Sequence, residues 1–213
     1  MKAHPSIGLL LLTTSSYAAT EIQLIDDFSQ SDLENWQAET FSGTTQYRQT
    51  HYQGRNALHA SSNSSASGLI FKTSIDINRT PWLNWEWNIP QPLPPHTEQT
   101  RSGDDFVARI YVIYSDHWKF WKTRSLSYVW SSSAGINAHW ANPYTRQAHM
   151  WVVRSGITDS GKWIHEKRNV KQDFEQAFGE KINKIQAIAI MTDTDNTKHS
   201  TQAYYGKIYF TAD

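Results

Sequence analysis

Apolar and polar positions alternate with a period of two along much of this chain, which is typical of β-strands that bury one face. In the clearest segment, large apolar side chains occupy every second position, namely Leu83, Trp85, Trp87 and Ile89. The side chains between them are polar, namely Asn84, Glu86 and Asn88. A continuous apolar run at 185–191 is typical of a central strand. We expect about nine or ten strands in the whole chain.

One segment predicts a short helix. Its apolar residues lie on one side at 174–178, Asp173 is the expected N-cap, and Gly179 is the expected stop. Strands without intervening helices favour an all-β fold, an antiparallel β-sandwich of jelly-roll type with this one short helix. No boundary divides residues 20–213, so we expect a single β-sandwich domain there.

Two long connections interrupt the strand pattern. Residues 61–67 are rich in serine and predict a surface loop. Residues 90–102 contain four prolines and predict a stiff loop, because proline is excluded from helix interiors and central strands. Long loops inside compact domains are often functional.

The N-terminus is typical of a secretory signal peptide at residues 1–18. Lys2 and His4 precede a short apolar run at 7–12, and Ser16 and Ala18 fit the small-residue cleavage pattern. The alternative is a disordered apolar N-terminus. The run is too short to span a bilayer, and no later segment reaches about 18 apolar residues. We therefore expect a periplasmic or secreted protein without a membrane span.

Composition narrows the classes of partner. The 213 residues include 20 basic and 20 acidic side chains without a basic stripe, which argues against a nucleic-acid partner. Cysteine is absent, so disulfides and thiolate metal sites are excluded. The chain has no P-loop or dinucleotide fingerprint, so no nucleotide cofactor is expected. The 10 Trp and 10 Tyr residues indicate a large aromatic core, a stacking platform for sugar rings, or both.

One charged residue contradicts its apolar surroundings. Arg109 lies in the middle of the predicted strand at 106–114, and a buried guanidinium needs an acidic partner. We expect either Asp104 or Asp105 to face Arg109, and the other to be solvated or to cap a turn, because strand alternation separates them. The candidate ion pairs elsewhere are Glu86 with Arg109 and Asp193 with Arg154.

An acidic loop at 192–197 resembles the start of a calcium-binding loop. The EF-hand pattern fails, because Thr197 and Tyr204 occupy positions where that loop requires oxygen ligands. A calcium site of another type, at Asp193, Asp195 and Asn196, remains the alternative to a turn rich in Asp and Asn, which we favour. No other cofactor is expected.

Several segments together resemble a bacterial domain-of-unknown-function family, the one numbered 3047. They are 103–109, 128–131, 142–144, 153–156, 171–174, 178–179, 188–197 and 204–206. The resemblance covers nearly all of the chain after the signal peptide. It implies an exported bacterial protein with a single domain, whose layout is similar to carbohydrate-binding jelly rolls. Fold analogy alone does not establish a function.

The leading hypothesis is an exported β-sandwich that binds carbohydrate or cell-envelope glycan without catalysis. The candidate ligand-binding residues are Glu86, Asp105, Arg109, Trp130, Trp140, Asn142, Tyr144, Arg154, Asp193 and Asp195. One alternative is a polysaccharide hydrolase or lyase, in which Glu86 works with Asp104, Asp105 or Asp193 as acid and base. A purely structural envelope protein is the third hypothesis.

Overall fold

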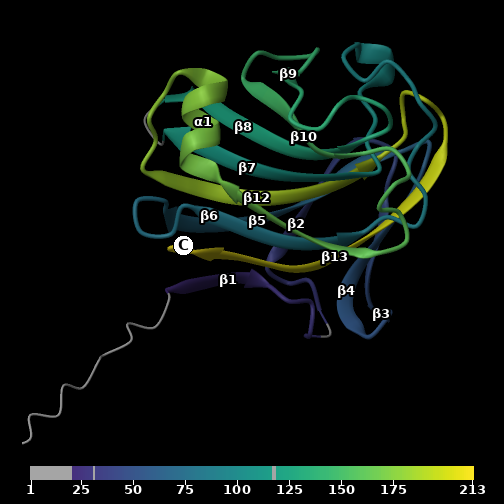
Figure 1. Cartoon of the computed structure of the whole chain (residues 1–213), viewed down its shortest axis with the longest axis horizontal. Coiled ribbons are helices and arrows are strands. Elements are labelled where there is room, and N and C mark those ends of the chain that lie inside the picture. Colours follow the sequence, from purple (N-terminus) through teal and green to yellow (C-terminus); the bar gives the residue numbers. More distant parts are fainter. Residues whose placement is uncertain (1–20, 31, 117–118) are drawn as a thin grey trace, which may run out of the picture.

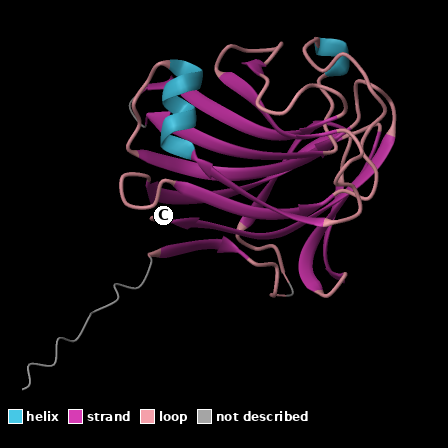
Figure 2. Cartoon of the chain, viewed as in Figure 1, coloured by secondary structure: helices cyan, strands magenta, loops and turns pink. Residues whose placement is uncertain are grey.

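The computed structural model describes residues 21–30, 32–116 and 119–213 (Figure 1). The predicted signal peptide at 1–18 lies outside these residues. The described chain forms thirteen strands, one α-helix and a short 3-10 helix, so the expected all-β sandwich of jelly-roll type with one α-helix is confirmed. Figure 2 shows how completely strands dominate the fold. Within the described residues, no helix is long and apolar enough to cross a membrane.

The first layer of the sandwich is a six-stranded sheet. Its strand order is β11 (Trp163–Asn169), β6 (Trp82–Asn88), β13 (Ser200–Thr211), β4 (Arg55–Asn63) and β3 (Gln46–Tyr52), with β1 (Ile22–Asp26) also paired to β13. All of these neighbours pair in the antiparallel sense.

The second layer is a seven-stranded sheet. Its strand order is β2 (Trp36–Ser42), β5 (Ala66–Asp76), β12 (Lys184–Asp193), β7 (Ala108–Asp116), β8 (Lys119–Ser131), β10 (Ala148–Ser155) and β9 (His139–Ala141). Its pairs are antiparallel except β8 with β10, which is parallel. The apolar run predicted as a central strand is β12, which lies between β5 and β7.

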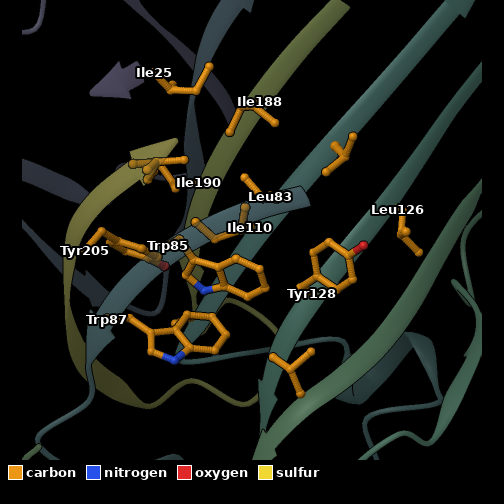
Figure 3. Packing of buried hydrophobic residues seen from close by; sticks show 14 of the residues in the cluster. Ile25, Leu83, Trp85, Trp87, Ile110, Leu126, Tyr128, Ile188, Ile190 and Tyr205 are labelled. Atoms are coloured by element: carbon orange, nitrogen blue, oxygen red, sulfur yellow. The ribbon is translucent and has the colours of Figure 1, made fainter. Parts of the chain in front are cut away.

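The core fills the space between the two sheets with large aromatic and branched side chains (Figure 3). Trp85 stacks on Tyr128 with ring centroids 5.2 Å apart, and it meets Trp87 edge-on at 5.4 Å. Burial of each such side chain contributes about 1.5–3 kcal/mol. Many of the tryptophan and tyrosine side chains therefore pack in the core, in agreement with the predicted large aromatic core.

Helix α1 (Val170–Phe178) packs at one end of the sandwich, and its start differs from the expectation. Its N-cap is Asn169, whose Oδ1 accepts a 3.1 Å hydrogen bond from the Gln172 N–H. Asp173 is not the N-cap: it lies inside the helix and is buried, and its carboxylate accepts hydrogen bonds from Arg168 and Tyr128. Gly179 ends the helix with φ of 66°, as predicted.

The serine-rich segment is part of the sheets, so the predicted surface loop at 61–67 is wrong. It forms the end of β4 and the start of β5, joined by a tight turn at Ser64. Ser62 and Ser67 are buried, and hydrogen bonds to protein partners compensate their hydroxyl groups for the loss of water. Ser62 Oγ lies 2.8 Å from Thr194 Oγ1, and Ser67 Oγ accepts a 2.8 Å hydrogen bond from the Thr45 N–H.

Candidate functional site

A pocket of about 460 Å³ lies on the outer face of the seven-stranded sheet, which faces away from the core. We call it the outer-face pocket. Its lining consists of Phe41, Ser42, Ala66, Asp104, Arg109, Tyr111, Ser125, Asn142, Tyr144, Ala148, Met191, Asp193, Asp195 and Asn196. Strands β12 and β7 lie side by side in this sheet (Figure 1). They contribute Met191, Arg109 and Tyr111 to the lining, and alternate residues of each strand point to the core instead.

An ion pair forms the inner wall of this pocket. Arg109 Nε donates a 2.9 Å hydrogen bond to Asp193 Oδ1, and Arg109 Nη2 donates to Asp193 Oδ2. Both residues are almost completely buried, with 2% and 1% of their surface exposed. The predicted pairs Glu86–Arg109 and Asp193–Arg154 are therefore wrong, because the partner of Arg109 is Asp193.

Asp104 completes the surroundings of the guanidinium. Arg109 Nη2 donates a 2.5 Å hydrogen bond to the Asp104 carbonyl oxygen, and Nη1 lies 3.4 Å from Asp104 Oδ1. Asp105 points elsewhere and accepts hydrogen bonds from the backbone N–H groups of Asn196 and Thr197. One of the two acids thus faces Arg109 and the other holds a turn. The separation comes from the loop before β7, because that strand begins only at Ala108.

Burial opposes ionisation of each of these groups, and its balance against charge and hydrogen bonds differs from one group to the next. It raises the pKa of the Asp193 carboxyl to about 7, against the opposing effect of the Arg109 guanidinium. Burial also opposes the charge of Arg109, but Asp193, Tyr111 and Asp104 together outweigh it, and the guanidinium pKa lies well above its usual value. Burial acts to raise the pKa of Asp105 as well, yet hydrogen bonds from Thr197 and Asn196 hold it below the usual value. The pair and its neighbours therefore form a charged network just below the pocket.

Two exposed aromatic side chains flank the pocket from opposite edges of the sheet. Phe41 lies near the end of edge strand β2, where the pairing with β5 shifts register between Thr40 and Ser42. Such a bulge re-aims a side chain, and Phe41 is 68% exposed. Tyr144 lies in the connection between β9 and β10 at the other edge and is 52% exposed. An entering molecule would meet both rings.

A hydrogen-bond network fixes the wall that carries Tyr144. Asn142 Nδ2 donates a 2.9 Å hydrogen bond to Asp104 Oδ2, and Asn142 Oδ1 accepts one from the Tyr144 N–H. The Tyr144 hydroxyl is 2.8 Å from the Arg101 carbonyl oxygen and 3.1 Å from Asn196 Oδ1. The wall is therefore ordered by side chains before any ligand arrives.

Trp140 supports this wall from behind and does not line the pocket. It is half-buried and packs against a small apolar cluster on the outer side of the sheet, formed by Phe106, Val129, Met150 and Val152. Trp130 is 1% exposed and belongs to the main core. Both were predicted ligand contacts, and neither lines the outer-face pocket, because Trp130 is sealed in the core and Trp140 packs on the apolar cluster.

Glu86 lies on the outer face of the opposite, six-stranded sheet. Its Oε1 accepts a 2.5 Å hydrogen bond from Arg55, which also lies over the Trp163 ring. An acid–base pair between Glu86 and an aspartate of the acidic network is therefore wrong, because the core separates them. The rings near Glu86 are packed on each other: Tyr52 stacks on Tyr204 with ring centroids 3.7 Å apart.

Arg154 is also outside the pocket. It pairs with Glu166 at 2.6 Å and with Asp159 at 2.8 Å. Glu166 belongs to β11 of the six-stranded sheet, and Arg154 belongs to β10 of the other sheet. This ion pair therefore joins the two layers, which is a structural role, and the predicted ligand contact Arg154 does not line the outer-face pocket.

Three carboxylates form a candidate cation cluster, since oxygens of Asp105, Asp193 and Asp195 lie within 4.8 Å of one another. The predicted trio contained Asn196 in place of Asp105. Asn196 instead donates its Nδ2 to Asp105 Oδ1 and Asp195 Oδ1. The oxygens of Asp193 and Asp105 already accept hydrogen bonds from Arg109 and from the 196–197 backbone. A cation here would have to share oxygens that protein donors occupy.

The structure brings together several predicted residues and adds others. Asp104, Arg109, Asn142, Tyr144, Asp193 and Asp195 line the outer-face pocket, and Asp105 supports it. Sequence reasoning missed Phe41, Tyr111 and Met191. The signal for Phe41 was weak, because a single aromatic residue before Gly43 reads equally well as a buried strand position.

Comparison with solved structures places the fold. A family 30 carbohydrate-binding module from Clostridium thermocellum is similar with a TM-score of 0.54 and 10% identity, over 90% of this chain and 98% of that chain. A CBM22-1 xylan-binding domain from Paenibacillus barcinonensis has a TM-score of 0.47 and 12% identity, over 93% and 99%. A glycoside hydrolase domain, Endo-D from Streptococcus pneumoniae R6, has a TM-score of 0.42 and 9% identity, over 84% of this chain. The chain spans only 22% of that hydrolase domain.

No curated protein matches the chain. A family model matches residues 34–209, which is most of the sequence and almost all of the sandwich. The chain therefore belongs to the family described as "Protein of unknown function (DUF3047)".

Proposed function

We propose that this chain is an exported protein that binds glycan in the outer-face pocket and does not cleave it. The observation that carries the proposal is the pair of exposed rings, Phe41 and Tyr144, that flank a pocket containing several polar groups. Sugar rings have apolar C–H faces that pack on aromatic rings, and hydroxyl groups that need polar partners. A pocket of this size with aromatic walls and a few fixed polar groups is typical of small-molecule sites.

The fold supports this proposal by analogy. The structure of the family 30 module shares the fold, and its name describes a carbohydrate-binding module. Fold does not imply function, so the argument depends on the pocket itself.

The pocket favours binding over cleavage. Glycosidases need two carboxyl groups that face each other across the scissile bond. Here Asp193 is bound to Arg109, and Asp104 faces the same guanidinium and accepts a hydrogen bond from Asn142. Asp105 accepts hydrogen bonds from the 196–197 backbone, so Asp195 has no free carboxyl group opposite it among the described residues of the pocket. Hydrolysis and a purely structural envelope role remain the competing proposals, and each gives a different result in the binding test.

The test is affinity gel electrophoresis of the purified protein against immobilised cell-wall and plant glycans, with the strongest ligand then titrated by calorimetry. Phe41→Ala and Tyr144→Ala are expected to weaken binding about tenfold each, that is by about 1.4 kcal/mol, because each removes an exposed ring on which a sugar can pack. Tyr209→Ala is the matched control, because this half-exposed ring lies on the six-stranded sheet.

Three results would contradict the proposal. Release of reducing ends from the bound glycan would favour a hydrolase. Absence of binding to every glycan would favour the structural role. Loss of binding in Tyr209→Ala, with Phe41→Ala unaffected, would move the site to the other sheet.

Export is tested separately. The protein is expressed with residues 1–18 in a Gram-negative host, and the periplasmic form is expected to begin at Ala19, as measured by intact mass. Retention of Met1 in a cytoplasmic form would contradict export.

A further inference from the structure

The guanidinium of Arg109 is committed to the protein, although it lines the pocket. Nε donates to Asp193, Nη2 donates to Asp193 and to the Asp104 carbonyl oxygen, and Nη1 faces Asp104 Oδ1. All three nitrogen atoms therefore have acceptors within the protein. Arg109 is a poor partner for the carboxylate of an acidic ligand, because binding that ligand would require breaking a buried ion pair.

The amide donors of the lining are committed in the same way. Asn142 Nδ2 donates to Asp104 Oδ2, and Asn196 Nδ2 donates to Asp105 and Asp195. The Tyr144 hydroxyl lies within hydrogen-bond distance of two acceptors, the Arg101 carbonyl oxygen and Asn196 Oδ1. Apart from the Ser42 and Ser125 hydroxyl groups, the lining therefore offers a ligand mainly the remaining lone pairs of its carboxylate oxygens, and a ligand that fits must supply the donors.

The charge of the lining is negative. Three carboxylates, Asp104, Asp193 and Asp195, face one guanidinium, Arg109, which leaves two net negative charges when all are ionised. With Asp193 protonated, one net negative charge remains. At the rim, burial first and then the Asp104 and Asp195 carboxylates raise the pKa of the Tyr144 hydroxyl, against the opposing effect of Arg101. The Arg101 guanidinium lies over the Tyr144 ring, outside the lining. Burial and Asp105 likewise raise the pKa of Asp195.

We infer that the outer-face pocket selects sugars that carry a free, protonated amino group, such as glucosamine units, and rejects sugars that carry a carboxylate. This inference rests on the proposed glycan binding and names the ligand class for the same pocket. An ammonium group supplies three donors and a positive charge, which matches a lining of acceptors with negative charge. A uronate supplies a negative charge and acceptor oxygens instead. The amide and guanidinium donors of the lining already have protein partners, so none is free to bind that carboxylate.

The test compares three oligosaccharides of equal length by calorimetry at pH 6 and low salt: glucosamine, N-acetylglucosamine and galacturonate oligomers. The glucosamine oligomer is expected to bind at least fivefold more tightly than its N-acetylated counterpart, and the galacturonate oligomer at least tenfold more weakly than either. The preference for the amine is expected to shrink in 0.5 M salt, because salt screens exposed charges.

Two isosteric variants assign the preference to this pocket. Asp195→Asn and Asp104→Asn are each expected to lower the ratio of glucosamine to N-acetylglucosamine affinity at least threefold. The matched control is Glu175→Gln, which removes one negative charge from an exposed position on α1 outside the lining. Melting temperatures are measured for all variants. If the melting temperature of one of the two aspartate variants is lowered, the affinity ratio of the other aspartate variant tests the inference.

The possible results distinguish failure of the amino-sugar preference from failure of the proposed glycan binding. Equal binding of the amine and the N-acetyl oligomers, tighter binding of galacturonate, or an unchanged ratio in both folded variants would overturn the inference while glycan binding stands. If none of the three oligomers and no glycan in the wider screen bound, the proposed function would fail with it.

Discussion

Arg109 and Asp193 lie on neighbouring strands and meet through two hydrogen bonds on the outer face of the sheet. The register pairs Arg109 with Met191, so the acid lies two residues further along β12, at the diagonal position. The N–H of Phe106 donates to the same carboxylate oxygen as Nε. This pair therefore fixes the end of β12 to the loop before β7, which carries Asp104 and Asp105.

Removing the cation from this pair should strongly destabilise the fold. Arg109→Met leaves a buried carboxylate without its partner, which costs about 3–5 kcal/mol. Urea unfolding at pH 7.5 measures the loss. The double variant with Asp193→Asn should recover part of it, because the charge is then also removed.

Arg55→Met is the matched control for that experiment. Arg55 pairs with Glu86 at the surface, with 45% of its side chain exposed, so its removal should cost less than about 1 kcal/mol. A loss of similar size in both variants would mean that burial does not distinguish the two ion pairs.

His149 should make the fold sensitive to mild acid. Burial, and then the neighbouring His139, lower its pKa to about 4. Below pH 6.5 the unfolded chain binds a proton that the folded chain does not, so stability falls as the pH drops from 6.5 towards 4. Between pH 7 and pH 5 the wild type should lose about 1 kcal/mol more than His149→Gln, after allowance for solvent screening.

Paired urea titrations at the two pH values measure this difference. The raised pKa of Asp193 acts in the opposite sense, because its stabilising contribution is complete at low pH and is lost as the pH rises to about 7. Both proteins share that contribution, so it cancels. An identical pH dependence of the two proteins would contradict the role of His149.

Gly103 should resist substitution because of its surroundings. A Cβ at this position would lie 2.4 Å from the Thr97 carbonyl oxygen, which is far inside van der Waals contact. Gly103→Ala should destabilise the protein by about 1–3 kcal/mol and displace the adjacent Asp104, which would weaken glycan binding. Gly135→Ala is the control, since nothing lies within 4 Å of the added atom. Thermal unfolding that shows equal effects at both positions would exclude the steric explanation.

Calcium should contribute little to stability. The oxygens of Asp193 and Asp105 already accept hydrogen bonds from protein donors, so the acidic loop is held without a cation. Addition of 5 mM calcium or of EDTA is expected to shift the melting temperature by less than about 1 °C, since a ligand stabilises only as far as it binds the folded state. A large rise with calcium, abolished in Asp195→Asn, would instead establish a metal site.

The sequence predicted the parts of the fold that depend on local pattern. The alternation at 83–89 and the apolar run at 185–191 both specify strands, and Gly179 specifies a helix end, because each signal depends on side-chain type within a few residues. The buried serines at 62–67 were misread, because a serine hydroxyl looks polar until its partners are known. Those partners, Thr45 and Thr194, are distant in the sequence.

The candidate site was harder to predict, for reasons of register. The prediction that a buried Arg109 has an acidic partner was correct. The choice among Glu86, Asp104 and Asp193 depends on which strands are neighbours. That information is absent from the alternation pattern, since a strand fits either sheet equally well. Phe41 was missed because its exposure results from a bulge in the pairing of β2 with β5.

Mapping amide chemical shifts while the best glycan ligand is titrated tests the central claim most directly. The account predicts that the largest shifts cluster at Phe41, Tyr144 and Asn196, around the outer-face pocket, and that the six-stranded sheet is unaffected. Shifts concentrated at Tyr52, Trp163 and Tyr204 would contradict it, because those residues lie on the opposite face of the sandwich.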